Sequence, residues 1–516
     1  MEIIRDILKL EELKGYEIIE SLIETDIYLN QGEADIEEIL WVDGKIEILN
    51  SKIIKDKILV NGLVKFELAY KSNEEELKIY LLESNKDFRE EIEIEGITED
   101  MGSQLKTNLE YIEYRIIDQR KISIGALINI SGKVDQVNLV EIVKDVKGDG
   151  DIQVLKEKVH YNHIKGREET FAFIKEAFEI ADEQPGIEEI LKTQVSVYEK
   201  EYSVSQDRII ISGVIDASII YLGGGRLNSV KREIPFTHFM EMENIEEDFK
   251  YQISMEVVDG QCELREDLAG EFKIIDLEVK IRVLGKAYNI EEKEIVVDLY
   301  STNKEINLQR EEINIVENMK YVIDSVEISK EIPAQGFKEV YAVETGSNMV
   351  ASQYIEDKII IEGILPINIY YLEEGTNNIA TLKDEIPFKS YISIEELDDY
   401  GNIPMINVET NVEELKYDLK GEVLNIQGKL KNHISIDMET QIDILTEVEE
   451  TDIIIDKKNQ PSIIVYIVQK DDKLWDIAKR YKTTMEEIIL SNEITNSNSL
   501  MPGEKIIIEK KVDIHF

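Results

Sequence analysis

The sequence predicts a mainly β protein: three tandem antiparallel β domains, each sandwich-like, followed by a small α+β module with the order strand–helix–helix–strand. Two observations predict this fold class. A motif with alternating apolar and polar residues occurs three times, whereas a short C-terminal tail carries apolar residues at helical spacing. The length of 516 residues agrees with this organisation, because ~150 residues per domain corresponds to three or four domains.

The repeated motif reads Asp-Lys-Ile or Asp-Arg-Ile and leads to a glycine. Its aspartates are Asp56, Asp207 and Asp357, and its glycines are Gly62, Gly213 and Gly363. A second shared landmark follows in each copy, at Asp87-Phe88, Pro235-Phe236 and Pro387-Phe388. The period of about 150 residues is too long for a solenoid or propeller, whose units span ~20–50 residues. It is the size of a complete domain.

Each copy is predicted to consist of strands. β-branched and aromatic residues alternate with polar ones over residues 58–68, 209–221 and 359–371. The shared glycine lies inside this strand, where a glycine usually marks a bulge or a close approach of the backbone. Turns are expected at residues 71–73, 223–225 and 373–375, each followed by a second strand that leads to the second landmark. A helical turn is expected only at residues 36–40 and their equivalents.

Polar stretches between the copies indicate the domain boundaries. The predicted units are a first β domain at residues 1–150, a second at 151–305, a third at 306–455, a linker at 456–462 and the terminal module at 463–510.

The tail has its own pattern. A short strand at residues 466–469 precedes a helix whose apolar positions run from Leu474 to Tyr481, with Asp472 placed to cap its first turn. Residues 484–487 form a capping box that opens a second helix, and a strand follows at 505–508. So small a unit requires efficient packing. Its predicted core consists of Leu474, Trp475, Ile477, Leu490 and Ile506, with the edge of Trp475 as an alternative contact for a partner.

Charge limits the partners. The chain carries 108 acidic and 59 basic side chains, for a net charge of −49, which disfavours binding to nucleic acid and to anionic membranes. The single cysteine, Cys262, excludes an internal disulfide. The N-terminus lacks the pattern of a signal peptide, and no apolar run approaches the ~18 residues of a membrane span. We therefore expect a cytoplasmic protein.

No set of residues indicates catalysis. The sequence offers no paired nucleophile and base, no nucleotide-binding loop and no metal-ligand spacing. We therefore predict a protein that is not an enzyme and that has no cofactor and no metal. Tandem copies of one domain favour multivalent binding instead, because linked sites raise the effective concentration of each other.

The tail resembles the LysM module. The resemblance rests on Tyr466, Val468, Asp472, Leu474, Trp475, Ile477, Ala478, Tyr481, Thr483, Thr484, Asn492, Leu500, Pro502 and Gly503. In that family a shallow groove between two loops binds glycans that contain N-acetylglucosamine. By position, the resemblance implies a ligand- or partner-binding groove formed by Asp471, Asp472, Lys473, Leu474, Trp475, Asn498, Ser499, Leu500, Met501 and Pro502. Asp471 and Lys482 replace two glycines of the family pattern, which favours a protein ligand over a sugar.

The three copies resemble the SPOCS domain of endospore-coat proteins. The resemblance rests on the Asp-Lys/Arg-Ile…Gly strand and on Ile-Pro-Phe at residues 234–236 and 386–388, from which the first copy departs with Asp87. Three such domains and a LysM module are similar to spore-coat morphogenetic proteins of the SipL type. This resemblance implies a mother-cell scaffold at the forespore surface that binds other coat proteins and the coat-basement ATPase (SpoIVA type), with LysM as a protein-interaction module. The alternative is a LysM protein that binds peptidoglycan at the cell or spore surface.

Overall fold

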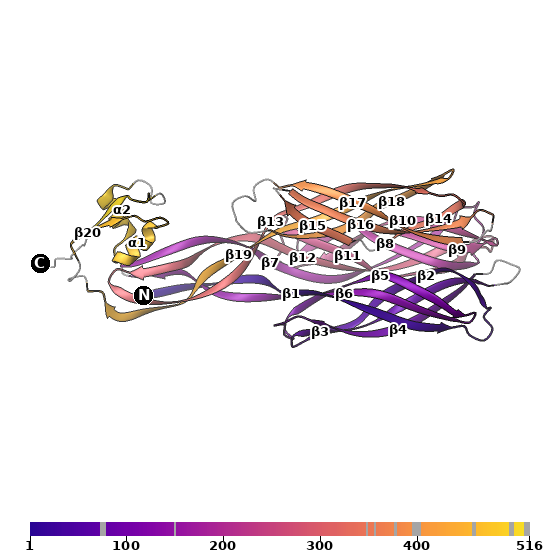
Figure 1. Ribbon diagram of the computed structural model, residues 1–516, viewed down its shortest axis with the longest axis horizontal. Coiled ribbons are helices and arrows are strands. Elements are labelled where there is room, and N and C mark those ends of the chain that lie inside the picture. Colours follow the sequence, from indigo (N-terminus) through magenta and orange to yellow (C-terminus); the bar gives the residue numbers. More distant parts are fainter. Residues whose placement is uncertain are drawn as a thin grey trace.

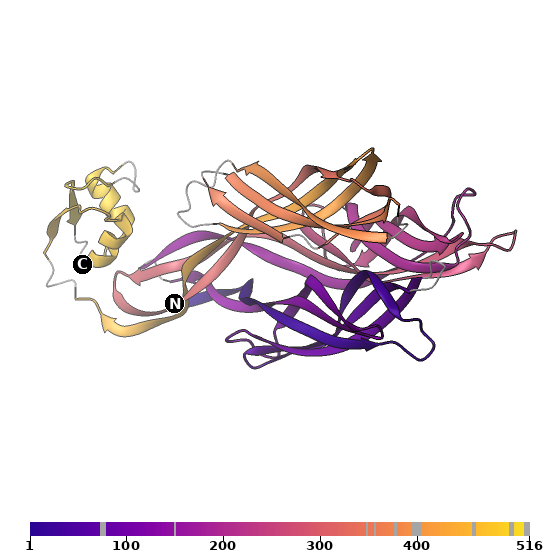
Figure 2. The same ribbon diagram turned by 45° about the vertical axis from the view of Figure 1, so that its right-hand side comes forward.

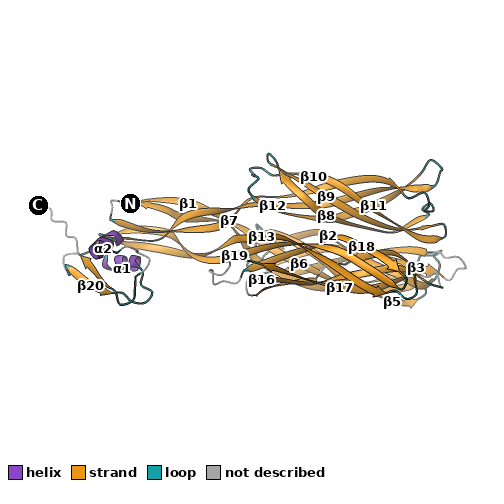
Figure 3. Ribbon diagram, turned by 90° about the horizontal axis from the view of Figure 1, so that it is seen from above, coloured by secondary structure: helices purple, strands orange, loops and turns teal. Residues whose placement is uncertain are grey.

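The computed structural model confirms a mainly β protein with a small helical module at its C-terminal end (Figures 1 and 3). The structure describes residues 1–509 except for eight short segments, which are residues 73–78, 149–150, 347–348, 356–357, 376–378, 395–403, 457–460 and 495–499.

All three repeats have the same plan of two antiparallel sheets. The first repeat contains β1 (Glu2–Tyr28), β2 (Ile36–Ile54), β3 (Lys57–Ser72), β4 (Ile79–Glu93), β5 (Gly102–Asp118) and β6 (Lys121–Lys147). The second contains β7 (Ile152–Glu179), β8 (Glu189–Val204), β9 (Arg208–Gly223), β10 (Arg226–Glu241), β11 (Lys250–Glu266) and β12 (Phe272–Ser301). The third contains β13 (Lys304–Pro333), β14 (Phe337–Thr345), β15 (Met349–Ile355), β16 (Lys358–Glu373), β17 (Ile379–Ser393), β18 (Met405–Lys420) and β19 (Val423–Ile454).

One sheet of each repeat is formed by its two longest strands and a third strand, in the orders β1-β6-β5, β7-β12-β11 and β13-β19-β18. The other sheet is a meander, with the orders β2-β3-β4 and β8-β9-β10; in the third repeat β14 and β15 both pair with β16, which also pairs with β17. A separate apolar core fills each sandwich. Alternate residues of β3, such as Ile58, Val60, Val64 and Phe66, are completely buried, as the period-two pattern predicts.

The two landmarks of the repeat lie opposite each other in the meander sheets. Gly62 pairs with Phe88, Gly213 with Phe236, and Gly363 with Phe388. A Cβ on Gly62 would lie 2.5 Å from Cζ of Phe88, and one on Gly213 would lie 2.6 Å from Cζ of Phe236. The phenylalanine ring therefore lies over the glycine backbone. The predicted close approach at the glycine is confirmed.

The predicted helical turn at residues 36–40 is wrong, because this segment begins the strand β2. The register of β2 against β3 shifts between Ile36 and Glu38 and again between Ile39 and Trp41. Each β-bulge adds a residue and breaks the alternation of buried and exposed side chains, so that apolar residues three apart imitate a helical pattern. The equivalent strands β8 and β14 contain similar bulges.

The three repeats pack around a common axis with approximate three-fold symmetry. Equivalent residues of the meander sheets meet in one buried cluster between the repeats. They include Leu40, Leu191 and Tyr341 from the first strand of each meander, and Ala69, Ile220 and Tyr370 from the second. Charged side chains join this cluster, since Lys192 of the second repeat contacts Asp43 of the first and Glu344 of the third at 2.8 Å each. The sandwiches therefore form one body.

The long strands continue beyond the sandwiches as a stalk (Figures 1 and 2). The beginnings of β1, β7 and β13 pair with the ends of β6, β12 and β19, and apolar side chains from all three pairs fill the interior. Cations link neighbouring repeats around the stalk: Arg5 donates to the carbonyl of Thr446, Arg310 donates to the carbonyl of Val297, and Lys156 pairs with Asp145. The sequence analysis did not predict the axis or the stalk.

The C-terminal module has the predicted order strand–helix–helix–strand. Its elements are β20 (Ile463–Ile467), α1 (Leu474–Tyr481), α2 (Met485–Asn492) and β21 (Lys505–Glu509). The capping box at α2 is confirmed, because the Thr484 side chain accepts a hydrogen bond from the backbone of Glu487 while the Glu487 side chain accepts one from the backbone of Thr484.

In the part of the chain that the structure describes, no helix has the length and apolarity that a membrane crossing requires.

Candidate functional site

The core of the terminal module is formed by residues of both helices, of β21 and of the position directly after β20, with Ile464 and Tyr466 of β20 partly buried against it. The buried residues are Val468, Leu474, Trp475, Ile477, Ala478, Ile488, Ile506 and Ile508. Four of the five predicted core residues are among them. The fifth, Leu490, was predicted wrongly: 77% of its surface is exposed. Ile488, Ile489 and Leu490 are consecutive apolar residues, so the spacing alone did not show which of them faces inward.

Asp472 organises the loop before α1 but does not cap the helix as predicted. The N-cap residue is Lys473, which makes no side-chain capping bond. The carboxylate of Asp472 instead accepts hydrogen bonds from the Tyr466 hydroxyl and from the backbone N–H of Gln469, each at 2.7 Å. These two bonds lower the pKa of Asp472. The loop is therefore tied to the end of β20.

Asp471 and Lys482, the two residues that replace family glycines, keep the backbone conformation of a glycine. Their φ angles are +67° and +55°, in the left-handed region that side chains with a Cβ disfavour. Lys482 is the C-cap of α1, and its backbone N–H bonds to carbonyls of the last turn. The replacements therefore change the surface of the two loops and leave the turn geometry intact.

The structure brings the two sides of the predicted groove together. The backbone N–H of Gly503 donates to the carbonyl of Val468 at 2.8 Å, which joins the loop before α1 to the loop before β21. Asp471, Lys473, Met501 and Pro502 are exposed on these loops, and Asp472 and Leu500 are half-buried. Leu474 and Trp475 are buried. Asn498 and Ser499 lie outside the described residues.

Trp475 contacts the second repeat of its own chain. Its indole N–H donates to the carboxylate of Asp298 at 2.7 Å, and its ring packs edge-on against Tyr300 with centroids 5.0 Å apart. Lys479, one turn further along α1, binds both oxygens of Asp298 at 2.7 and 2.8 Å. The Tyr300 hydroxyl donates to the carbonyl of Thr483 at 2.7 Å. The module is therefore docked on the tip of the stalk, where β12 ends (Figures 1 and 2).

The contact favours the ionised form of Asp298. Burial alone would raise the pKa of its carboxyl group, but hydrogen bonds from Lys479 and Trp475 and the charges of Lys479 and Arg310 bring the pKa below its ordinary value. Asp298 and Tyr300 were not predicted from the sequence. The sequence does contain one indication of this contact. The residues equivalent to Tyr300 are Lys147 and Glu449, so an aromatic side chain replaces a charged one in the second repeat only.

The outer face of the β20–β21 sheet is exposed and has an apolar centre, with Lys505 and Glu509 of β21 at its two ends. Ile463, Val465 and Ile467 alternate along β20 with 61%, 59% and 51% of their surfaces exposed. Ile507 of β21 pairs with Val465 and extends the same face. Contiguous exposed apolar side chains of this kind are typical of an interaction surface.

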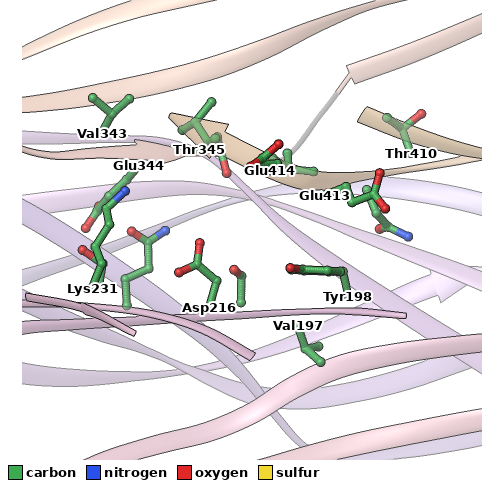
Figure 4. Close-up of a pocket in the computed structure, with 17 residues that line it drawn as sticks. Val197, Tyr198, Asp216, Lys231, Val343, Glu344, Thr345, Thr410, Glu413 and Glu414 are labelled. Carbon is green, nitrogen blue, oxygen red and sulfur yellow. The ribbon is translucent and has the colours of Figure 1, made fainter. Parts of the chain in front are cut away.

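A polar cavity of about 360 Å³ lies between the second and third repeats (Figure 4). Asp216 and Lys231 line it from the second repeat, and burial raises the pKa of Asp216 and lowers that of Lys231. At the equivalent face of the first repeat, Lys65 forms an ion pair with Glu47, and Lys45 forms one with Asp259 of the second repeat. Within the described ranges, neither histidine nor cysteine lines this cavity, and no cluster of three or more His, Cys, Asp or Glu side chains is arranged to hold a metal ion.

Comparison with known families identifies the domains. The SPOCS domain of SipL matches residues 35–117, 186–265 and 337–420, and the LysM domain matches residues 466–509. No curated protein and no solved structure matches the chain. The fold and the matches define a protein with three tandem SPOCS domains and a C-terminal LysM domain, both of them non-catalytic binding domains. The three SPOCS segments and the C-terminal LysM domain match the organisation of SipL-type proteins, and they support a role related to the sporulation coat.

Proposed function

We propose that the protein is a non-enzymatic scaffold of spore-coat morphogenesis, which acts in the mother-cell cytoplasm at the forespore surface. It binds the coat-basement ATPase of the SpoIVA type, and it helps to localise the coat and to encase the forespore. The observation that carries this proposal is the exposed apolar face of β20–β21, held at the end of a long stalk and away from the three sandwiches.

The charge and the repeats support a role in assembly. A body with a net charge of −49 repels other acidic surfaces, so a partner that docks closely has to be basic or has to bind through apolar contacts. Three similar domains in one body also offer several contacts to a partner that is itself present in many copies, and linked contacts strengthen each other.

The test measures binding of the purified ATPase to the full chain. Val465→Glu places a charge in the centre of the apolar face, and we expect it to abolish binding that the wild type shows at micromolar concentration. Leu490→Glu is the matched control, because Leu490 is also an exposed apolar residue of the module but lies on α2. Equal binding by wild type and Val465→Glu would refute the assignment of this face. Failure of the wild-type chain to bind at all would refute the proposed partner.

Glycan binding is the second candidate function. The left-handed backbone at Asp471 and Lys482 favours it, because the loops keep the geometry of the LysM family despite the loss of glycine. Co-sedimentation of the full chain with purified sacculi tests it. Pelleting that N-acetylglucosamine oligomers reverse would support this function, and a chain that stays in the supernatant would exclude it.

A further inference from the structure

The stalk carries an acidic residue at the same position of each repeat. Asp145, Asp298 and Glu447 lie opposite Ile4, Leu155 and Gln309 in the paired long strands, and equivalent apolar residues flank all three in the interior of the stalk. Asp145 pairs with Lys156 at 3.0 Å, and Asp298 pairs with Arg310 at 2.6 Å. The approximate three-fold symmetry therefore explains one cationic partner for Asp298, but not the other two donors.

The additional donors come from the LysM module. Trp475 and Lys479 both contact Asp298, which is only 9% exposed as a result. Tyr300, two residues further along β12, packs beside Trp475, and its hydroxyl donates to the carbonyl of Thr483 between α1 and α2. Its equivalents Lys147 and Glu449 offer no aromatic ring. The tip of the second repeat is therefore specialised relative to the other two.

Docking through α1 determines which face of the module is presented. In Figures 1 and 2, α1 lies beside the strands of the stalk and β20 lies on the far side of the module. Ile464 and Tyr466 of β20 pack against the core of the module, so the exposed residues that alternate with them face away from that core. A module that hung freely on its linker would present this face in many orientations, and a partner that also contacts the repeats would have to select one of them.

We propose that the tip formed by Asp298 and Tyr300 is a docking site that fixes the orientation of the LysM module, and that Asp298 is a positioning residue for partner binding. The partner contacts the apolar β20–β21 face, and the docked module fixes the orientation of that face relative to the scaffold body. This inference rests on the proposed function, which it deepens by naming the residues that orient the interaction surface.

The experiment compares Asp298→Asn with Asp145→Asn in the full chain. Both substitutions remove one carboxylate charge from the stalk, but only the first removes the ion pair with the module. The chain has two tryptophans, so the indole N–H signals in a ¹⁵N spectrum report docking directly. We expect Asp298→Asn to shift the Trp475 signal and to accelerate its hydrogen exchange, whereas the signal of the buried Trp41 stays unchanged. Asp145→Asn should change neither signal.

Binding of the coat-basement ATPase is then measured with the same proteins. We expect about a tenfold weaker affinity for Asp298→Asn, equivalent to about 1.4 kcal/mol, and an unchanged affinity for Asp145→Asn. Lys479→Ala removes the same ion pair from the side of the module and should weaken binding equally. The double variant Asp298→Asn, Lys479→Ala should bind the ATPase with the same affinity as either single variant, because the two residues act through one contact.

The outcomes separate the two levels of the argument. Undocking of the module without any loss of affinity would overturn the positioning role, and a Trp475 signal unaffected by Asp298→Asn would overturn the docking role of Asp298. A wild-type chain that shows the docked Trp475 signal but does not bind the ATPase would overturn the proposed function, and the positioning role with it, while the docking site would stand.

Discussion

Lys192 is the residue on which the packing of the three repeats can be tested most directly. It lies at the junction of all three with 6% of its surface exposed, and it donates to Asp43, Glu344 and Tyr370 from the two neighbouring repeats. Its charge holds the pKa of Asp43 below the ordinary value, although burial opposes this effect. Burial raises the pKa of Glu344 more than Lys192 lowers it. Lys192→Met therefore leaves two carboxylates without their shared cation.

Removal of one partner from a buried ion pair costs ~3–5 kcal/mol. We expect a loss near 3 kcal/mol for Lys192→Met, because the side chain of Asp43 is 44% exposed and water stabilises its charge in part. The loss should depend on pH. Without Lys192, we expect burial to raise the folded-state pKa of both carboxyl groups above the unfolded values, less so for Asp43, because Lys383 and the Gly44 N–H still favour its charged form. The destabilisation is then complete at neutral pH and is relieved as pH falls through the raised values.

The loss of stability and its pH dependence are measured by urea unfolding of the full chain at about pH 7 and about pH 5. Unfolding is monitored by the fluorescence of Trp41, whose ring centroid lies 6.3 Å from that of Tyr370. The midpoint for Lys192→Met should fall at pH 7 and recover part of the difference at pH 5. A triple variant with Asp43→Asn and Glu344→Gln should unfold near the wild-type midpoint, because replacement of a whole buried ionic cluster is often neutral. A Lys192→Met midpoint equal to wild type at both pH values would show that the cluster does not hold the repeats together.

Three further predictions concern single side chains. Trp475→Ala should destabilise the LysM module by ~3–5 kcal/mol and unfold it, whereas Trp475→Phe should keep it folded; unchanged helical circular dichroism for Trp475→Ala would contradict the buried position. Lys482→Gly should raise the melting temperature of the module by relieving ~1 kcal/mol of left-handed backbone strain, and a lower melting temperature would refute that reasoning. Phe236→Ala should uncover the backbone at Gly213 and cost ~3–5 kcal/mol in the second repeat, which is detectable as faster amide exchange in β9; exchange equal to wild type would show that the ring does not protect this strand.

The sequence predicted those parts of the fold that depend on local periodicity. Alternation identified β3 and its equivalents, helical spacing identified α1, and the loss of alternation at Tyr466 separated the module from the repeats. Where a β-bulge interrupts the alternation, as at residues 36–40, the same reasoning produced a helical turn. Bulges depend on the partner strand, which periodicity in one strand does not report.

The candidate site was predicted only as far as the module itself extends. The residues of the two loops and the core position of Trp475 follow from the LysM pattern. The docking contact does not, because Asp298 and Tyr300 are separated from Trp475 by about 180 residues, and the aromatic ring that Tyr300 adds to the second repeat does not show which segment it contacts. The position of Lys192 shows the same limit: its equivalents are Trp41 and Ala342, and only the packing of three repeats makes a lysine suitable there.

A single chain with three repeats can do what a trimer of identical subunits cannot. Equivalent positions around a true three-fold axis must carry the same residue, so a buried lysine there would occur three times and bring three cations close together. In this chain Lys192 meets Asp43 and Glu344, at positions where the three repeats have diverged. The same freedom applies at the stalk tip, where Tyr300 replaces a charged residue once. The result is a nearly symmetric body with one docking site for one LysM module, which gives the assembly a defined direction that three identical tips would not provide.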